Sequence, residues 1–205
     1  MKRFGIWFAA ALVSAAAVMS AGCGRKQEEQ PSDSQSAQES MSGTKEAGAV
    51  YADSLEVMKL IWDGFDEDDK FSSYGGSDLE NPVMDAPGSF DVSDTDALSA
   101  TLIIPQSLHG KIDDAASLIH MMNSNNFTGA AFRVKGTEPS SAAEELKNAV
   151  MDNPFMCGFP EKLVVITSGD YVVYAFGIED SVNSFKKAAE KKLEDAVIVF
   201  EQRME

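Results

Sequence analysis

Cys157 and the two histidines of the chain, His109 and His120, are the residues whose chemistry suits covalent catalysis or metal binding. A cysteine thiolate activated by a histidine base is a common enzymatic nucleophile. The segment 155–159 around Cys157 is rich in Phe and Met, which favours burial, and a buried thiol is inert. No pair among these residues has zinc-finger or HExxH spacing. We therefore expect a small buried cysteine and ordinary histidines, with thiol chemistry at Cys157 as the alternative.

Two acidic runs, at 66–69 and 91–96, offer carboxylate oxygens of the kind that Ca²⁺ prefers. An EF-hand loop needs Gly at its sixth position and Glu at its twelfth. Counted from Asp66 the sixth residue is Phe71, and counted from Asp91 it is Asp96, so neither run fits. The runs predict solvated loops, and a cation-responsive surface over 66–96 stays a minor hypothesis. The sequence also has no phosphate-binding glycine loop, nucleophile elbow or dinucleotide fingerprint.

Cys23 ends a segment that has the features of a secretory signal. Lys2 and Arg3 are followed by an uncharged stretch over 4–22, which closes with the run SAGC at 20–23. This ending resembles a bacterial lipobox, in which the cysteine carries a diacylglycerol and the chain is cut just before it. The resemblance implies a lipoprotein signal peptide over 1–22 and a lipidated Cys23, although Ser20 replaces the usual Leu. An uncleaved anchor or ordinary cleavage are alternatives, and all three place the rest outside the cytoplasmic membrane.

The charge balance excludes some functions. The 205 residues include 17 Lys+Arg and 33 Asp+Glu, for a net charge of −16, so no basic face could bind nucleic acid. Cleavage before Cys23 removes Lys2 and Arg3, and two positive charges fewer make the net charge −18. Residues 23–48 lack aromatic side chains and predict a disordered tether. We expect one domain over 49–205.

Hydrophobic periodicity over 49–205 predicts an α+β domain. The predicted elements are a helix over 50–65, an acidic loop over 66–96 with a short strand near 71–74, a strand over 102–104, a helix over 112–122, a strand over 127–134, a helix over 139–152, a hairpin of strands 163–167 and 171–176, a helix capped by Asp180 and reaching Leu193, and a strand over 196–200.

From residue 127 the order is β-α-β-β-α-β, which predicts a ferredoxin-like antiparallel sheet over about 127–202 with two helices on one face. The hairpin strands are apolar on both faces, so a second layer must cover them. We expect this cover from an N-terminal extension, made of the helix over 50–65 and the strand–helix unit over 102–122.

Several short blocks occur together in the second half of the chain: MMN at 121–123, FT at 127–128 with AFRV at 131–134, FMCGFP at 155–160, GDYVV at 169–173 and AFG at 175–177. In this order they resemble a group of uncharacterised lipoproteins from anaerobic Gram-positive bacteria, catalogued as a domain of unknown function. The resemblance covers about residues 100–202. It supplies no catalytic residues, agrees with the lipobox, and implies that Cys157-Gly158 is a fixed structural turn.

These features together predict a lipid-anchored protein on the extracytoplasmic face of the cell membrane. We expect a non-enzymatic binding or accessory module of the cell envelope, without a cofactor or metal. Its expected partners are the membrane, through Cys23, and an envelope protein or small ligand. The alternative is an envelope enzyme or redox accessory that uses Cys157.

Overall fold

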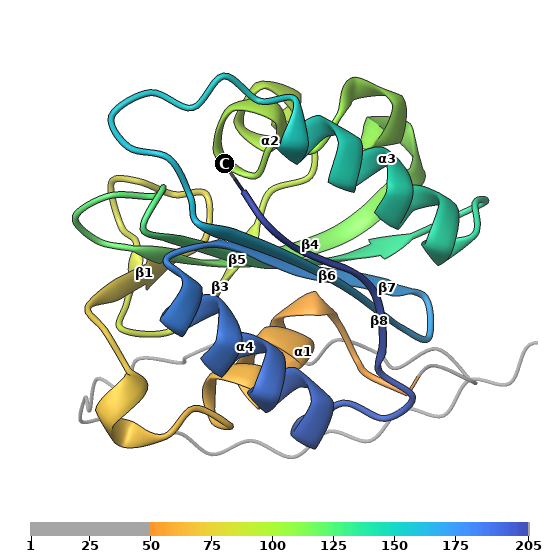
Figure 1. Ribbon diagram of the computed structural model, residues 1–205. Helices are drawn as coiled ribbons and strands as arrows, with labels where there is room; N and C mark the ends of the chain where they lie inside the picture. The colour runs from red at the N-terminus through yellow and green to blue at the C-terminus, as the bar shows by residue number, and fades with distance from the viewer. Residues whose placement is uncertain (1–49, 205) are drawn as a thin grey trace, which may run out of the picture. The chain divides into compact units, whose positions relative to one another are not determined.

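The computed structural model describes residues 50–204, which form an eight-stranded antiparallel sheet with helices on both faces (Figure 1). The strand order is β2 (Val83–Met84), β1 (Ser73–Gly75), β4 (Ile112–His120), β5 (Phe127–Val134), β7 (Tyr171–Gly177), β6 (Lys162–Ser168) and β8 (Val197–Arg203), and β3 (Gly88–Phe90) also pairs with β4. All these pairs are antiparallel. The predicted α+β class is confirmed.

Two helical layers enclose the sheet (Figure 1). Helices α1 (Ser54–Trp62) and α4 (Glu179–Lys192) pack on one face, and α2 (Thr95–Thr101) and α3 (Pro139–Met151) pack on the other. Two short 3-10 helices, η1 (Glu67–Asp69) and η2 (Gln106–Lys111), connect these elements. Strands β6 and β7 are buried along almost their whole length because each face of the sheet has its own hydrophobic cluster.

The ferredoxin-like arrangement predicted from residue 127 onward is not confirmed. Helices α3 and α4 lie on opposite faces of the sheet, so the prediction that they share one face is wrong. Strand β8 pairs with β6 at one edge of the sheet, and β4 occupies the side of β5 that β7 leaves free. The physical reason lies in the hairpin: both of its faces are apolar, and one helix on each face buries both.

The segment from 102 to 122 was predicted as a strand followed by a helix, and both assignments are wrong. Residues 112–120 form β4, which pairs with β3 and β5. Five consecutive residues, Ala115 to Ile119, are buried, because both faces of this strand are covered. Leu102 and Ile104 are buried in a turn after α2, where Ile103 has a φ of 56°. The N-terminal extension was expected to cover the face opposite the two helices, but its helices are divided between the faces, with α1 beside α4 and α2 beside α3.

The other predicted helices and strands are confirmed, with ends shifted by a few residues. The predicted cap of α4 is wrong, because Asp180 lies inside the first turn and Ile178 holds the N-cap position. Glu161 acts in its place, since a carboxylate oxygen of Glu161 accepts a hydrogen bond from the backbone N–H of Glu179 at 2.9 Å. A residue from before β6 therefore caps α4.

The acidic segment over 66–96 is more structured than predicted. It contains η1, β1, β2, β3 and the start of α2, and only β1 was anticipated near its place. The predicted signal peptide, Cys23 and the tether lie outside the described residues. Within residues 50–204, no helix combines the length and the apolar character that crossing a membrane requires.

Candidate functional site

Cys157 lies in the loop over 152–161, between α3 and β6, and it is exposed. The prediction that its neighbours bury it is wrong, since Met156 and Phe159 are also exposed and only Phe155 packs inward, with its ring 5.5 Å from that of Phe176. Cys157 has a φ of 65° and Gly158 a φ of 121°. A cysteine holds a positive φ only where its surroundings fix the turn.

Two asparagines of the neighbouring loop over 121–126 fix this turn. The side-chain amide of Asn125 donates hydrogen bonds to the carbonyl oxygens of Met156 and Gly158, each at 2.8 Å. The amide of Asn123 donates to the carbonyl oxygen of Cys157 at 3.0 Å. Three consecutive carbonyls are thus held from one loop, and we call Asn123 and Asn125 the asparagine clamp.

The histidines make their contacts away from the thiol. His109 lies in η2, where its Nε2 is 3.1 Å from both the Ser99 hydroxyl and the carbonyl oxygen of Ile104. His120 ends β4, and its Nδ1 accepts a hydrogen bond from the backbone N–H of Met122. Among the contacts of residues 50–204, neither imidazole forms a hydrogen bond with Cys157, so the geometry shows no histidine base bonded to the thiol.

The acidic runs are engaged in structural contacts. Asp66 pairs with Lys187 of α4 at 2.8 Å, and a hydrogen bond from Lys187, together with its charge, holds the pKa of Asp66 below its ordinary value. Asp69 accepts a hydrogen bond from Ser184, and Asp94 caps α2. In the part of the chain that the structure describes, no three His, Cys, Asp or Glu residues are placed to hold a metal ion. The calcium hypothesis finds no support in this geometry.

Four apolar side chains stand exposed on the two clamped loops. They are Met121, Met122, Met156 and Phe159, with exposed fractions of 43%, 87%, 81% and 74%. Single exposed apolar residues are normal in soluble proteins, but a group of them on adjoining loops is typical of an interaction surface. We call these four residues the loop patch.

The two loops that carry the patch, over 121–126 and 152–161, and the start of the body at residue 50 lie at opposite ends of the sheet (Figure 1). Tyr51 is held beside the β6–β7 turn, with its hydroxyl 3.2 Å from that of Ser168 and its ring 5.7 Å from that of Tyr171. The patch loops adjoin the other end of the same strands, where Phe127 pairs with Gly177. At roughly 3.3 Å per residue, β7 separates the two ends by about 20 Å.

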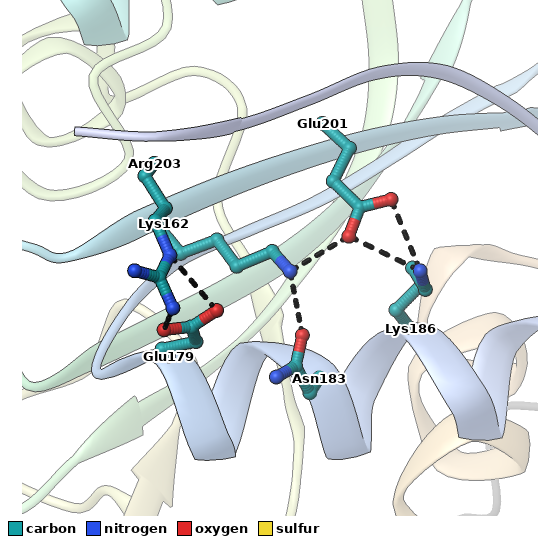
Figure 2. Close-up of polar contacts among 6 residues, drawn as sticks. All are labelled: Lys162, Glu179, Asn183, Lys186, Glu201 and Arg203. Atoms are coloured by element: carbon teal, nitrogen blue, oxygen red, sulfur yellow. Dashed lines mark hydrogen bonds and ion pairs between the residues drawn. The ribbon is translucent and has the colours of Figure 1, made fainter.

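A polar cluster holds edge strand β8 against α4 (Figure 2); its members are Lys162, Glu179, Asn183, Lys186, Glu201 and Arg203. The ammonium of Lys162 lies 2.7 Å from Glu201 and donates to Asn183 at 2.6 Å. Hydrogen bonds from Lys162 and Lys186 lower the pKa of Glu201. The side chains of Arg203 and Glu179 form a separate ion pair. Because each charge has a partner in the cluster, its role is structural.

Sequence reasoning did not find the asparagine clamp or the loop patch. The available signal was the run MMNSNN at 121–126. In it, two methionines and three asparagines stand directly before a strand. Asparagine favours turns because its side chain bonds nearby backbone groups, but which backbone it reaches depends on the fold. No protein-family model, curated protein or solved structure matches the chain.

Proposed function

We propose that this protein is a lipid-anchored binding module on the extracytoplasmic face of the cell membrane, and that it binds a protein partner through the loop patch. The observation that carries this proposal is the exposure of the patch at the end of the sheet opposite Tyr51. A lipidated Cys23 and a flexible tether, about 25–30 Å long for some 25 residues, would join the body at Tyr51. The patch would then face away from the attachment point.

Binding is favoured over catalysis by the way the reactive groups of the body are used. The carboxylate of Glu201 forms ion pairs with both Lys162 and Lys186. The imidazole of His109 is hydrogen-bonded to the Ser99 hydroxyl and the Ile104 carbonyl. The clamp holds the backbone carbonyls of 156–158 in the patch, while the four patch side chains stay exposed. A rigid loop that presents apolar side chains suits a docking surface.

The anchor is tested by metabolic labelling with a fatty-acid analogue. Wild-type protein should take up the label and sediment with membranes, and the Cys23→Ala variant should lose the label. Unchanged labelling of the variant would contradict lipidation at Cys23, whatever the patch binds.

The binding surface is tested by photo-cross-linking in cells. A photoreactive phenylalanine at Met122 or Met156 should give one discrete protein adduct, identified by mass spectrometry. The matched control is Val197 of β8, an apolar residue that is 56% exposed but lies away from the patch loops. Equal adduct patterns from Met122 and Val197 would contradict a specific surface.

The exposure of Cys157 favours a second candidate, an envelope enzyme or redox accessory that uses its thiol. Such a thiol should react with iodoacetamide at neutral pH faster than a small-molecule thiol does, since catalysis requires an activated thiolate. A rate equal to or below that of the free thiol, with Cys157→Ser as the blank, would rule this candidate out.

A further inference from the structure

We infer that the loop patch binds a basic amphipathic protein segment, one that presents apolar side chains flanked by Lys or Arg. This inference rests on the proposed binding function and adds the chemistry of the partner.

The apolar part of the partner follows from the side chains of the patch. Three of the four are methionines: Met156 stands on the turn whose carbonyls the clamp holds, and Met121 and Met122 directly precede the clamp in its own loop. Methionine is unbranched and polarizable, so it adapts its shape to varied apolar partners. A fixed backbone with adaptable side chains suits an apolar helix face or strand rather than a small rigid ligand.

The basic part of the partner follows from the charges around the patch. The loops over 121–126 and 152–161 contain no Lys or Arg, and they contribute the carboxylates of Asp152 and Glu161. Two cations lie nearby, and both are paired: the buried Lys162 with Glu201, and the exposed Arg203, which lies beside Glu161, with Glu179. An apolar surface with an acidic rim is electrostatically complementary to Lys and Arg, and this complementarity speeds association and selects the partner.

Other occupants fit these observations less well. A second copy of the chain would bring Asp152 and Glu161 against their own equivalents, and an anionic membrane would meet the same repulsion. The tether of the chain itself, over 24–48, includes Arg25 and Lys26 but only one large apolar side chain, Met41. One side chain cannot cover the four apolar side chains of the loop patch.

The test uses the chain from residue 23 onward, with Cys23→Ala to remove the lipid. The probe is a fluorescent 18-residue helix of Leu and Lys, and the control probe has Glu in place of every Lys. Fluorescence anisotropy should show saturable binding of the Leu/Lys helix and at least tenfold weaker binding of the Leu/Glu helix. The double variant Met122→Ser/Met156→Ser should bind the Leu/Lys helix at least tenfold more weakly than the parent.

The matched control is Val197→Ser/Val199→Ser, which removes two exposed apolar side chains from β8 and should leave binding unchanged. Thermal unfolding of each variant confirms that it is folded. Asp152→Asn should weaken binding a fewfold and reduce its salt dependence. Equal affinity for the two helices, or no effect of the patch variant, would overturn the inference.

Cosedimentation with phosphatidylglycerol vesicles separates the membrane from the protein partner. Loss of vesicle binding in the patch variant, with helix binding intact, would also overturn the inference in favour of a lipid surface. The outcomes are distinguishable from those of the cross-linking test. A discrete adduct at Met122 without Leu/Lys binding would leave the binding function and reject only the basic partner, whereas Leu/Lys binding without an adduct would reject the cellular function alone.

Discussion

The ammonium nitrogen of Lys162 lies 2.7 Å from a carboxylate oxygen of Glu201, and this ion pair joins β6 to edge strand β8. Lys162 is only 8% exposed, so water solvates little of its charge. The stabilisation that water would provide comes instead from Glu201 and from the Asn183 amide oxygen, 2.6 Å from the same nitrogen. The attachment of strand β8 to the sheet therefore depends in part on the carboxylate of Glu201, which is the counter-charge of the nearly buried Lys162.

Replacing Glu201 with Gln should destabilise the fold. Glu201→Gln leaves the buried ammonium of Lys162 without its counter-charge, and we expect the free energy of unfolding to fall by about 1–2 kcal/mol. Urea denaturation measures this change. The control is Glu190→Gln, at an exposed position on the same helix as Lys186, which should change stability by less than about 0.5 kcal/mol. Equal effects of the two substitutions would contradict a structural role for the pair.

The contribution of Glu201 should also depend on pH. Hydrogen bonds from Lys162 and Lys186 hold the pKa of Glu201 below its ordinary value. A carboxyl whose pKa is lowered by folding adds stability that is complete above its unfolded pKa, about 4.3 for Glu, and that is lost as the pH falls through the folded pKa. The gap in melting temperature between wild type and Glu201→Gln should therefore be constant near pH 7 and shrink below about pH 4. A gap that is independent of pH down to pH 2.5 would refute this assignment.

Strand β4 shows where sequence patterns stop being informative. Ile112, Ala115, Ala116 and Ile119 recur at helical spacing, yet they lie in a strand because β3 and β5 flank it and both of its faces are covered. A strand buried on both faces loses the polar–apolar alternation that distinguishes strands from helices. The β6–β7 hairpin was predicted correctly because a Ser-Gly-Asp turn separates two β-branched runs. Local turn chemistry was readable, whereas long-range pairing was not.

The candidate site was predicted less well than the fold. The sequence singled out Cys157 as an unusual residue. The prediction that it is buried was wrong, because the Phe and Met residues around it suggested burial. The turn is exposed, and Asn123 and Asn125 hold its carbonyls from another loop, more than 30 residues away in sequence. A tertiary side-chain contact of this kind has no periodic signal, so exposed apolar loops and buried ones look alike in sequence.

Replacing Asn125 should loosen the turn without unfolding the body. Asn125→Ala removes the two hydrogen bonds to Met156 and Gly158 from exposed loops, so the free energy of unfolding should change by less than about 1 kcal/mol. Backbone amides of 155–159 should exchange with deuterium faster, because the positive φ of Cys157 loses its support. Hydrogen-exchange mass spectrometry measures this. Asn81→Ala, at an exposed turn that bonds Asp78, is the control and should leave 155–159 unchanged. Unaltered exchange in Asn125→Ala would show that the clamp does not hold the turn.

Replacing Tyr51 should weaken the attachment of the N-terminal end of the body. The buried hydroxyl of Tyr51 accepts a hydrogen bond from the backbone N–H of Glu194 at 2.6 Å and contacts the Ser168 hydroxyl. Tyr51→Phe keeps the ring in its place beside Tyr171 and removes these contacts together with the hydrogen bond that the hydroxyl donates to the Glu194 carbonyl at 3.3 Å, so we expect a loss of about 1 kcal/mol. Chemical denaturation gives the loss, and faster exchange of residues 50–56 would locate it. Tyr74→Phe, at a half-buried hydroxyl that makes no hydrogen bond within residues 50–204, should cost less than half as much. Equal costs for the two substitutions would mean that the Tyr51 hydroxyl does not hold the start of the body to the β6–β7 turn.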